Sequence, residues 1–87
     1  MMADHKKVLR LLRTARGQLD GIIKMVEEDR YCIDVSTQVM AADAMLKRVN
    51  REILAAHLEY CVKDAVNEEE RREKIDEFVE TLGRILK

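Results

Sequence analysis

Two cysteines and one histidine are the residues in this sequence best suited to binding a metal. Cys32, His57 and Cys61 lie in a stretch, 32–61, that contains no glycine or proline and is rich in strong helix formers. If this stretch is one helix, then at about 100° per residue the three side chains project from a single stripe. Thiolate and imidazole are soft ligands that suit Cu(I) best and Zn(II) next. We therefore predict a metal site built from these three residues.

The two cysteines cannot meet within one chain. At a rise of about 1.5 Å per residue, Cys32 and Cys61 are about 43 Å apart along a straight helix, whereas a disulfide needs Cα atoms about 4.4–6.8 Å apart. Antiparallel pairing of two copies would bring Cys32 beside His57 and Cys61 of the partner subunit, and two-fold symmetry would make this contact twice. The sequence thus predicts an antiparallel dimer with two shared sites. Apolar core filling is the alternative use of the cysteines.

The spacing of the apolar residues predicts how the long helix, 32–64, is packed. A seam with alternating steps of four and three runs along its length, as in a coiled coil. Its members are Val35, Val39, Ala42, Leu46, Val49, Ile53, Ala56 and Tyr60. The long helix should therefore pack against other helices along its whole length.

Two shorter helices flank the long one. A helix over 5–28, with Asp4 as N-cap, should bury Val8, Leu12, Ala15, Leu19, Ile22 and Val26. A helix over 68–86, with Asn67 as N-cap, carries the apolar residues Ile75, Phe78, Val79, Leu82, Ile85 and Leu86. The prediction is an all-α protomer of three helices with one long central helix.

Composition agrees with a single all-helical domain spanning 1–87. The chain has no proline and three glycines, and 38% of its residues are charged. No apolar run approaches the roughly 20 residues that cross a bilayer, so we expect a cytoplasmic protein that does not contact membranes. Cysteines in a reducing compartment are more often metal-binding or redox-reactive than bridged. No nucleophile is paired with an oriented base, so an enzyme is not expected.

The charges are unevenly distributed although the formal net charge is −1. Residues 1–24 carry six basic and two acidic side chains, whereas residues 63–80 carry eight acidic and four basic ones. Lys6, Arg10, Arg13 and Lys24 cluster on one side of the first helix, with Arg16 on a flank. Such a face is either an ordinary solvated surface or a surface that holds DNA phosphates.

Several short motifs resemble the CsoR/RcnR family of metal-sensing bacterial repressors. They are Arg16-Gly17-Gln18, Tyr31-Cys32-Ile33-Asp34-Val35, Gln38, Leu46-Lys47, His57-Leu58 and Cys61-Val62. The resemblance extends from about Lys7 to the end of the sequence. The Cys, His, Cys spacing is similar to that of the copper-sensing CsoR branch. The sulfide-responsive branch lacks the histidine, and the nickel and cobalt branch has a histidine in place of the second cysteine.

The resemblance implies roles for further residues. It implies that Arg16, Gln18, Lys47 and Arg48 take part in binding duplex operator DNA, together with the basic face that carries Arg10 and Arg13. It places Tyr31 and Glu77 around the metal-binding histidine, where either could accept its second ring N–H. It also implies that dimers pair into a homotetramer. His5 is a weaker candidate, because a histidine near a chain terminus is usually exposed polar surface. It is considered because nickel-sensing relatives use a histidine near this end.

The predicted function is a Cu(I)-responsive repressor that binds operator DNA without metal and leaves it when Cu(I) binds. Release would derepress genes for copper efflux or storage. One alternative is a repressor of the same fold that senses oxidants or persulfides through Cys32 and Cys61. Another is a helical copper-binding protein that does not bind DNA.

Overall fold

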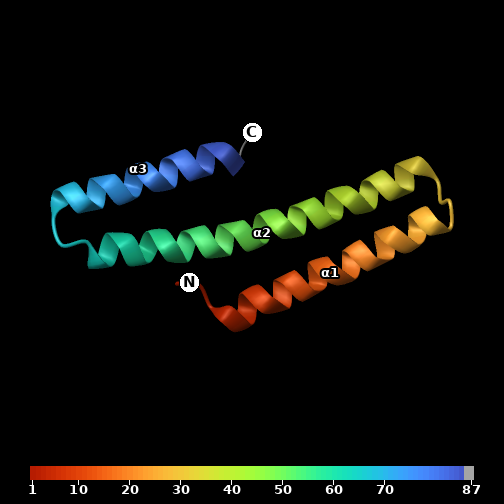
Figure 1. The fold of residues 1–87 in the computed structure, drawn as a ribbon, viewed down its shortest axis with the longest axis horizontal. Coiled ribbons are helices and arrows are strands. Elements are labelled where there is room, and N and C mark those ends of the chain that lie inside the picture. Colours follow the sequence, from red (N-terminus) through yellow and green to blue (C-terminus); the bar gives the residue numbers. More distant parts are fainter. Residues whose placement is uncertain (86–87) are drawn as a thin grey trace. The chain divides into compact units, whose positions relative to one another are not determined.

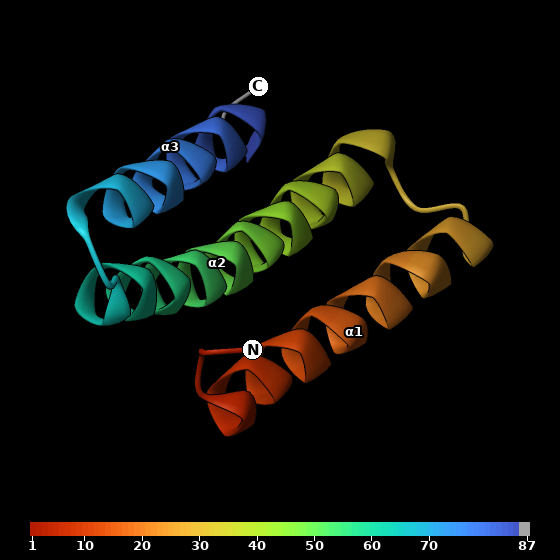
Figure 2. The same ribbon diagram turned by 60° about the vertical axis from the view of Figure 1, so that its left-hand side comes forward.

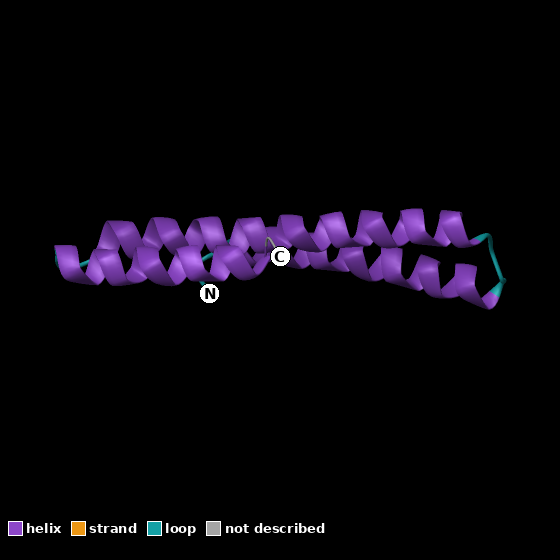
Figure 3. Cartoon of the chain, turned by 90° about the horizontal axis from the view of Figure 1, so that it is seen from above, coloured by secondary structure: helices purple, strands orange, loops and turns teal. Residues whose placement is uncertain are grey.

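The computed structural model describes residues 1–85, and three α-helices account for most of them. These are α1 (His5–Glu27), α2 (Cys32–Asp64) and α3 (Glu68–Ile85), shown in Figure 1. No strand occurs within these 85 residues, as Figure 3 makes clear. The predicted all-α protomer with a long central helix is confirmed. Leu86, predicted as the end of the third helix, lies outside the described residues.

The chain divides into two compact units, and the boundary between them falls within α2. One unit comprises residues 4–50, which are α1 and the first part of α2. The other comprises residues 1–3 and 51–85, which include the rest of α2 and all of α3. In each unit two helical segments run antiparallel, as Figures 1 and 2 both show. Each unit is therefore a helical hairpin.

Local hydrogen bonds define both ends of α1. The Asp4 carboxylate accepts from the backbone N–H groups of Lys6 and Lys7, which confirms the predicted N-cap. At the other end, the Arg30 N–H donates to the Met25 carbonyl and the Asp29 N–H donates to the Val26 carbonyl. This pair of bonds is a Schellman motif. It stops the helix at Glu27, one residue earlier than predicted, because Glu28 has already become the C-cap.

Asp29 occupies the left-handed position that this motif requires. Its φ of 55° is the only positive φ of a non-glycine residue within residues 1–85. Aspartate tolerates this conformation better than most residues, whereas a β-branched side chain clashes with the backbone.

We expect Asp29→Val to lower the free energy of unfolding by about 1–2 kcal/mol, because valine is strained in the left-handed region. Urea unfolding followed by circular dichroism, at one fixed protein concentration, would measure the loss. Asp29→Gly is the matched control and should show no comparable loss, since glycine adopts this φ freely. Equal unfolding midpoints for the valine and glycine variants would contradict this account of the turn.

The start of α3 is also capped. The Asn67 side chain accepts the Glu70 N–H at 2.8 Å, which confirms the predicted N-cap. In return, the Glu70 carboxylate accepts the Val66 N–H at 3.2 Å. This reciprocal arrangement closely resembles a capping box. It marks the start of α3, so that only a short connection joins α3 to α2.

The face of α1 that is buried differs from the predicted one. Val8, Leu11 and Ala15 are buried, and Ile22 and Met25 are partly buried. Three members of the predicted stripe are instead exposed in the single chain; they are Leu12, Leu19 and Val26. Steps of three and four that begin at Val8 can continue to Leu11 or to Leu12, and the rotation of α1 about its axis decides between them.

The seam of α2 divides in a similar way. Ala42 and Val49 are buried, and Met45 between them is partly buried. Other members of the predicted seam are exposed, namely Val39, Leu46 and Tyr60. These three, at intervals of seven and fourteen residues, lie along one stripe of the helix. A row of large apolar side chains therefore remains uncovered in one chain.

No helix within residues 1–85 is both long enough and apolar enough to cross a lipid bilayer. The long helix α2 contains charged residues throughout its length.

Candidate metal centre

The second part of α2 brings His57 and Cys61 together. They are four residues apart on one helix, so their side chains lie on the same face one turn apart. The Cys61 Sγ atom is 3.5 Å from the His57 Nε2 atom. Cys61 is 8% exposed and His57 is partly buried. One largely covered thiol and one partly exposed imidazole, 43% exposed, are thus held side by side.

This spacing suits two ligands of one soft metal ion. An ion about 2.3 Å from a sulfur and about 2.0 Å from a nitrogen separates these atoms by about 3.5–3.7 Å at tetrahedral or trigonal angles. The observed 3.5 Å falls at the tetrahedral end of that range. The pair therefore fits a metal ion without rearrangement of the helix, and it leaves room for further ligands.

Glu77 of α3 also lies near this pair. Its Oε1 atom is 4.0 Å from His57 Nε2, and Lys74 lies 3.9 Å from its other oxygen. The nitrogen nearest to Glu77 is thus also the one nearest to Cys61. A role for Glu77 as acceptor of the second ring N–H would require the other nitrogen, Nδ1, to bind the metal. The thiol of Cys61 and the carboxylate of Glu77 therefore both approach the same ring nitrogen of His57.

Cys32, the first residue of α2, and Tyr31, which precedes it, belong to the other unit. Both side chains are exposed. Among residues 1–85 of one chain, no three His, Cys, Asp or Glu side chains gather closely enough to hold a metal ion. One chain therefore presents a pair of candidate ligands toward one end of α2 and a single exposed thiol at the other. His5 is the first residue of α1 and is exposed.

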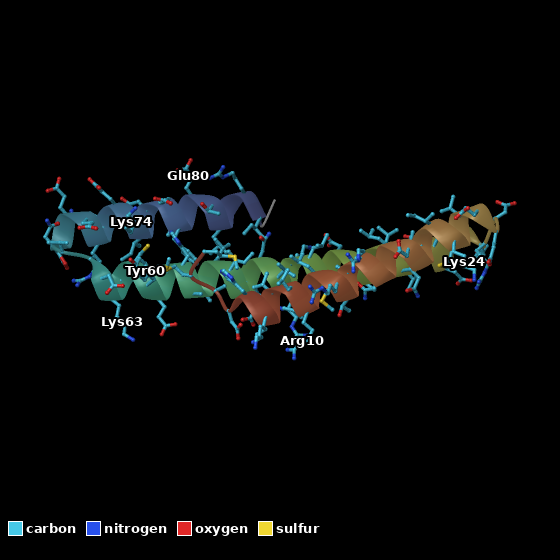
Figure 4. The ribbon with its side chains drawn as sticks, turned by 60° about the horizontal axis from the view of Figure 1, so that its bottom comes forward. Arg10, Lys24, Tyr60, Lys63, Lys74 and Glu80 are labelled. Carbon is cyan, nitrogen blue, oxygen red and sulfur yellow. The ribbon has the colours of Figure 1, made fainter. Side chains whose placement is uncertain are left out.

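The arginines of the basic face project from α1 into solvent. Arg10, Arg13 and Arg16 are all exposed. Figure 4 shows the side chain of Arg10 extending away from the ribbon, and Lys24 near the far end of the same helix. These guanidinium groups are free to reach a negatively charged partner.

Lys47 and Arg48 of α2 are exposed as well. Lys47 already has a partner, because its Nζ atom is 3.0 Å from the Asp43 carboxylate one turn earlier. Both side chains of this pair are 60% exposed. Ion pairs of this kind contribute only about 0.2–1 kcal/mol, so Lys47 can exchange Asp43 for another anion at little cost.

Gln18 has a different environment from the arginines. It is partly buried, and its position continues the spacing of the buried residues Leu11 and Ala15. Its Oε1 atom is buried and has no hydrogen-bond partner within the described residues. An unpaired buried acceptor costs about 1–3 kcal/mol, so a water molecule or a donor from a binding partner would stabilise this amide.

Sequence reasoning missed two residues near the His57–Cys61 pair. Met1 and Met2 line a pocket together with His57 and Glu77. Methionine thioethers are soft metal ligands, so the residue type alone could have marked these two methionines as candidates. Their spacing could not, because more than fifty residues separate them from His57 in the sequence.

The chain matches a known family over nearly its whole length. Residues 4–84 match the family described as "Metal-sensitive transcriptional repressor". The copper-sensing transcriptional repressor CsoR of Mycobacterium ulcerans (strain Agy99) is 44% identical over 82 residues, covering 93% of this chain and 70% of the relative. CsoR of Bacillus subtilis (strain 168) is 33% identical over 84 residues, covering 97% and 83%.

Solved structures agree with this assignment. The copper-sensing repressor CsoR with Cu(I) from Geobacillus thermodenitrificans NG80-2 has a TM-score of 0.82 at 32% identity, covering 94% of this chain and 85% of that one. The nickel-responsive transcriptional regulator InrS has a TM-score of 0.81 at 32% identity, covering 98% and 96%. The chain therefore belongs to the family of metal-sensitive transcriptional repressors.

Proposed function

We propose that this protein is a Cu(I)-responsive transcriptional repressor that acts in the cytoplasm. Residues 1–87 form a single domain that both senses the metal and binds DNA. It binds duplex operator DNA without metal, and Cu(I) releases it, so that genes for copper efflux or storage are transcribed. The observation that carries this proposal is the Cys61–His57 pair, 3.5 Å apart, in a chain of the metal-sensitive repressor family. The curated relatives with this fold are named copper-sensing repressors.

The ligand types favour Cu(I) over other metals. Two thiolates and one imidazole form a soft donor set, which suits Cu(I) better than Ni(II) or Zn(II). This matters because a nickel-responsive regulator has the same fold. Metal specificity must therefore depend on the types of ligand and not on the fold.

A second copy of the chain supplies the missing thiolate. Cys32 is exposed, and the uncovered apolar residues Val39, Leu46 and Tyr60 provide a surface for antiparallel pairing of two α2 helices. Each site then takes Cys32 from one chain and His57 with Cys61 from the other, with Tyr31 and Glu77 nearby. Two such dimers associate into a tetramer.

The exposed basic residues of α1 and α2 bind the DNA. Arg10, Arg13, Arg16, Lys47 and Arg48 contact phosphates, which positions the duplex without reading bases. Gln18 contacts a phosphate through its side-chain NH₂ group, which donates to a phosphate oxygen. Its amide oxygen cannot take part, because a phosphate oxygen offers no hydrogen-bond donor.

Copper can release DNA only if it binds the DNA-free conformation more tightly than the DNA-bound one. The coupling is reciprocal, so operator DNA must weaken copper binding by the same factor. The test is an anaerobic Cu(I) titration with and without DNA from the protein's own promoter region. The proposal requires release by Cu(I) and a weaker copper affinity in the presence of DNA. No binding to that DNA would favour a copper-binding protein that does not act on transcription.

A sulfur-responsive repressor is a second candidate, and the exposed thiol of Cys32 favours it. A thiolate that solvent can reach is open to oxidants and persulfides. Oxidation to a bridge between Cys32 and Cys61 of the partner subunit would transfer two electrons to the oxidant. This chemistry does not require His57.

The ion pair between Asp43 and Lys47 gives a prediction about the DNA surface. Lys47→Ala should weaken operator binding, because one phosphate contact is lost. The slope of log affinity against log salt concentration should become shallower by about one, since about one counterion fewer is released. Asp43→Asn should strengthen binding by up to about fivefold, since it frees Lys47 from an exposed ion pair. Fluorescence anisotropy over a salt series would measure both.

The double variant, Asp43→Asn with Lys47→Ala, is the control. If Asp43 acts by holding Lys47, then removing the lysine should abolish most of the gain. An unchanged operator affinity in Lys47→Ala over the whole salt series would exclude this part of α2 from the DNA surface.

A further inference from the structure

A pocket of about 230 Å³ opens beside the metal-binding histidine, within the unit made of residues 1–3 and 51–85. The N-terminal segment forms one wall, and Figures 1 and 2 show the N-terminus alongside the second part of α2. Met1, Met2, His57, Glu77 and Phe78 are among the lining residues. Ala3, which follows the two methionines, is only 7% exposed. This short segment is therefore docked.

The two methionines combine access to solvent with access to the pocket. Met1 is 61% exposed and Met2 is 49% exposed, whereas Cys61 is 8% exposed. An incoming ion can thus reach the two methionine side chains directly, but Cys61 is largely covered. His57 belongs both to the pocket and to the pair with Cys61. The imidazole therefore connects the open donors to the buried one.

Thioether sulfur selects for soft metal ions. It carries no charge and loses no proton on binding, and together with thiolate it favours Cu(I) over the harder divalent ions. Methionine is also flexible, with three rotatable bonds. Two such side chains around a 230 Å³ pocket can close on an ion while part of the pocket remains open.

We propose that Met1, Met2 and His57 form an entry site that takes up Cu(I) within one chain before the ion reaches the two cysteines. This inference rests on the proposed copper response and adds a step to it. The ion remains Cu(I) throughout, so no electron is transferred. As Cys61 and then Cys32 of the partner subunit replace the thioethers, each thiol releases its proton to water.

A variant without thiols isolates the entry site. In Cys32→Ala/Cys61→Ala, anaerobic competition against a Cu(I) chelator should reveal a weak site, and X-ray absorption should report thioether sulfur and nitrogen around the copper. Adding Met1→Leu/Met2→Leu, expressed behind a removable N-terminal fusion so that the start codon is kept, should lower this affinity by more than the roughly tenfold that changes around a metal ligand cost, because both thioether ligands are lost. Leucine keeps the volume and apolar character of the pocket wall. Met40→Leu, an exposed methionine outside the pocket lining, is the matched control.

A kinetic measurement with all cysteines present covers the case in which the variant without thiols does not fold. Met1→Leu/Met2→Leu should take up Cu(I) from the chelator more slowly than the wild type, because the exposed soft donors are lost. Its final affinity and its release from DNA at equilibrium should be unchanged. Met40→Leu should follow the wild type in every respect.

The outcomes separate this inference from the proposed function. If wild-type protein does not leave DNA on addition of Cu(I), the proposed function is wrong. If wild-type protein responds and the double leucine variant takes up copper at the same rate, the entry site is wrong and the methionines only fill the wall of the pocket.

Discussion

Tight copper binding is expected to be absent from Cys32→Ala and from Cys61→Ala, and to return when the two variants are mixed. Each variant alone lacks one of two thiolates at every site. The loss of affinity should be well above the roughly 10–100-fold that changes around a metal ligand cost. Within the described residues of one chain, no complete metal cluster exists. A site shared between chains explains why complementation should work.

Mixing restores a site because the two defects can fall at the same end of a dimer. At one end of a mixed dimer, Cys32 comes from the Cys61→Ala chain, while His57 and Cys61 come from the Cys32→Ala chain. At the other end both cysteines are missing. If subunits exchange freely, half of the dimers are mixed, and each binds one Cu(I) tightly.

Anaerobic chelator competition would measure the restored sites, and native mass spectrometry would establish that subunits have exchanged. The matched control is a mixture of Cys32→Ala with Cys32→Ala/Cys61→Ala chains, in which no end of any dimer can be complete. If exchange occurs and no site returns, the antiparallel dimer proposed here cannot be correct.

The second large effect is expected from His57→Ala. Removal of the imidazole leaves two thiolates but takes away the ligand that lies 3.5 Å from Cys61 and 4.0 Å from Glu77. Release of DNA by Cu(I) should be lost or strongly weakened. Formation of a disulfide between Cys32 and Cys61 of the partner subunit should survive, because thiol chemistry depends on the two sulfurs. One substitution therefore distinguishes a copper sensor from a sulfur sensor.

The measurement is operator binding by anisotropy, with Cu(I) in one series and an oxidant such as a persulfide donor in another. His5→Ala is the matched control, since it removes the other histidine of the chain at an exposed position. It should respond to Cu(I) as the wild type does. Release of His57→Ala at the wild-type copper dose would argue strongly against the copper response proposed here.

The sequence alone determined the helices and the closeness of His57 and Cys61, because both depend on local spacing. Asp4 and Asn67 cap helices where they were predicted to, since a capping side chain bonds to N–H groups two or three residues away. The Cys61–His57 pair follows from a separation of four residues on one helix. Such features do not depend on how one helix packs against another.

Only the tertiary structure decided which face of each helix is covered. Leu11 is buried and Leu12 is exposed, although the two are adjacent and equally apolar. Nothing in the local pattern distinguishes them, because the choice depends on the rotation of α1 against the rest of its unit. The same rotation buries the amide oxygen of Gln18. The sequence around it does not predict this burial, because Arg16, two residues earlier, is exposed.

The surroundings of His57 likewise depend on contacts between distant segments. The resemblance placed Glu77 near the histidine, and the packing of α3 brings its carboxylate to 4.0 Å. The docking of Met1 and Met2 had no sequence signal beyond their residue type. Local spacing identifies ligands that share a helix. A ligand or a pocket wall contributed by another segment becomes visible only when the chain is folded, because its position depends on packing between elements that are far apart in sequence.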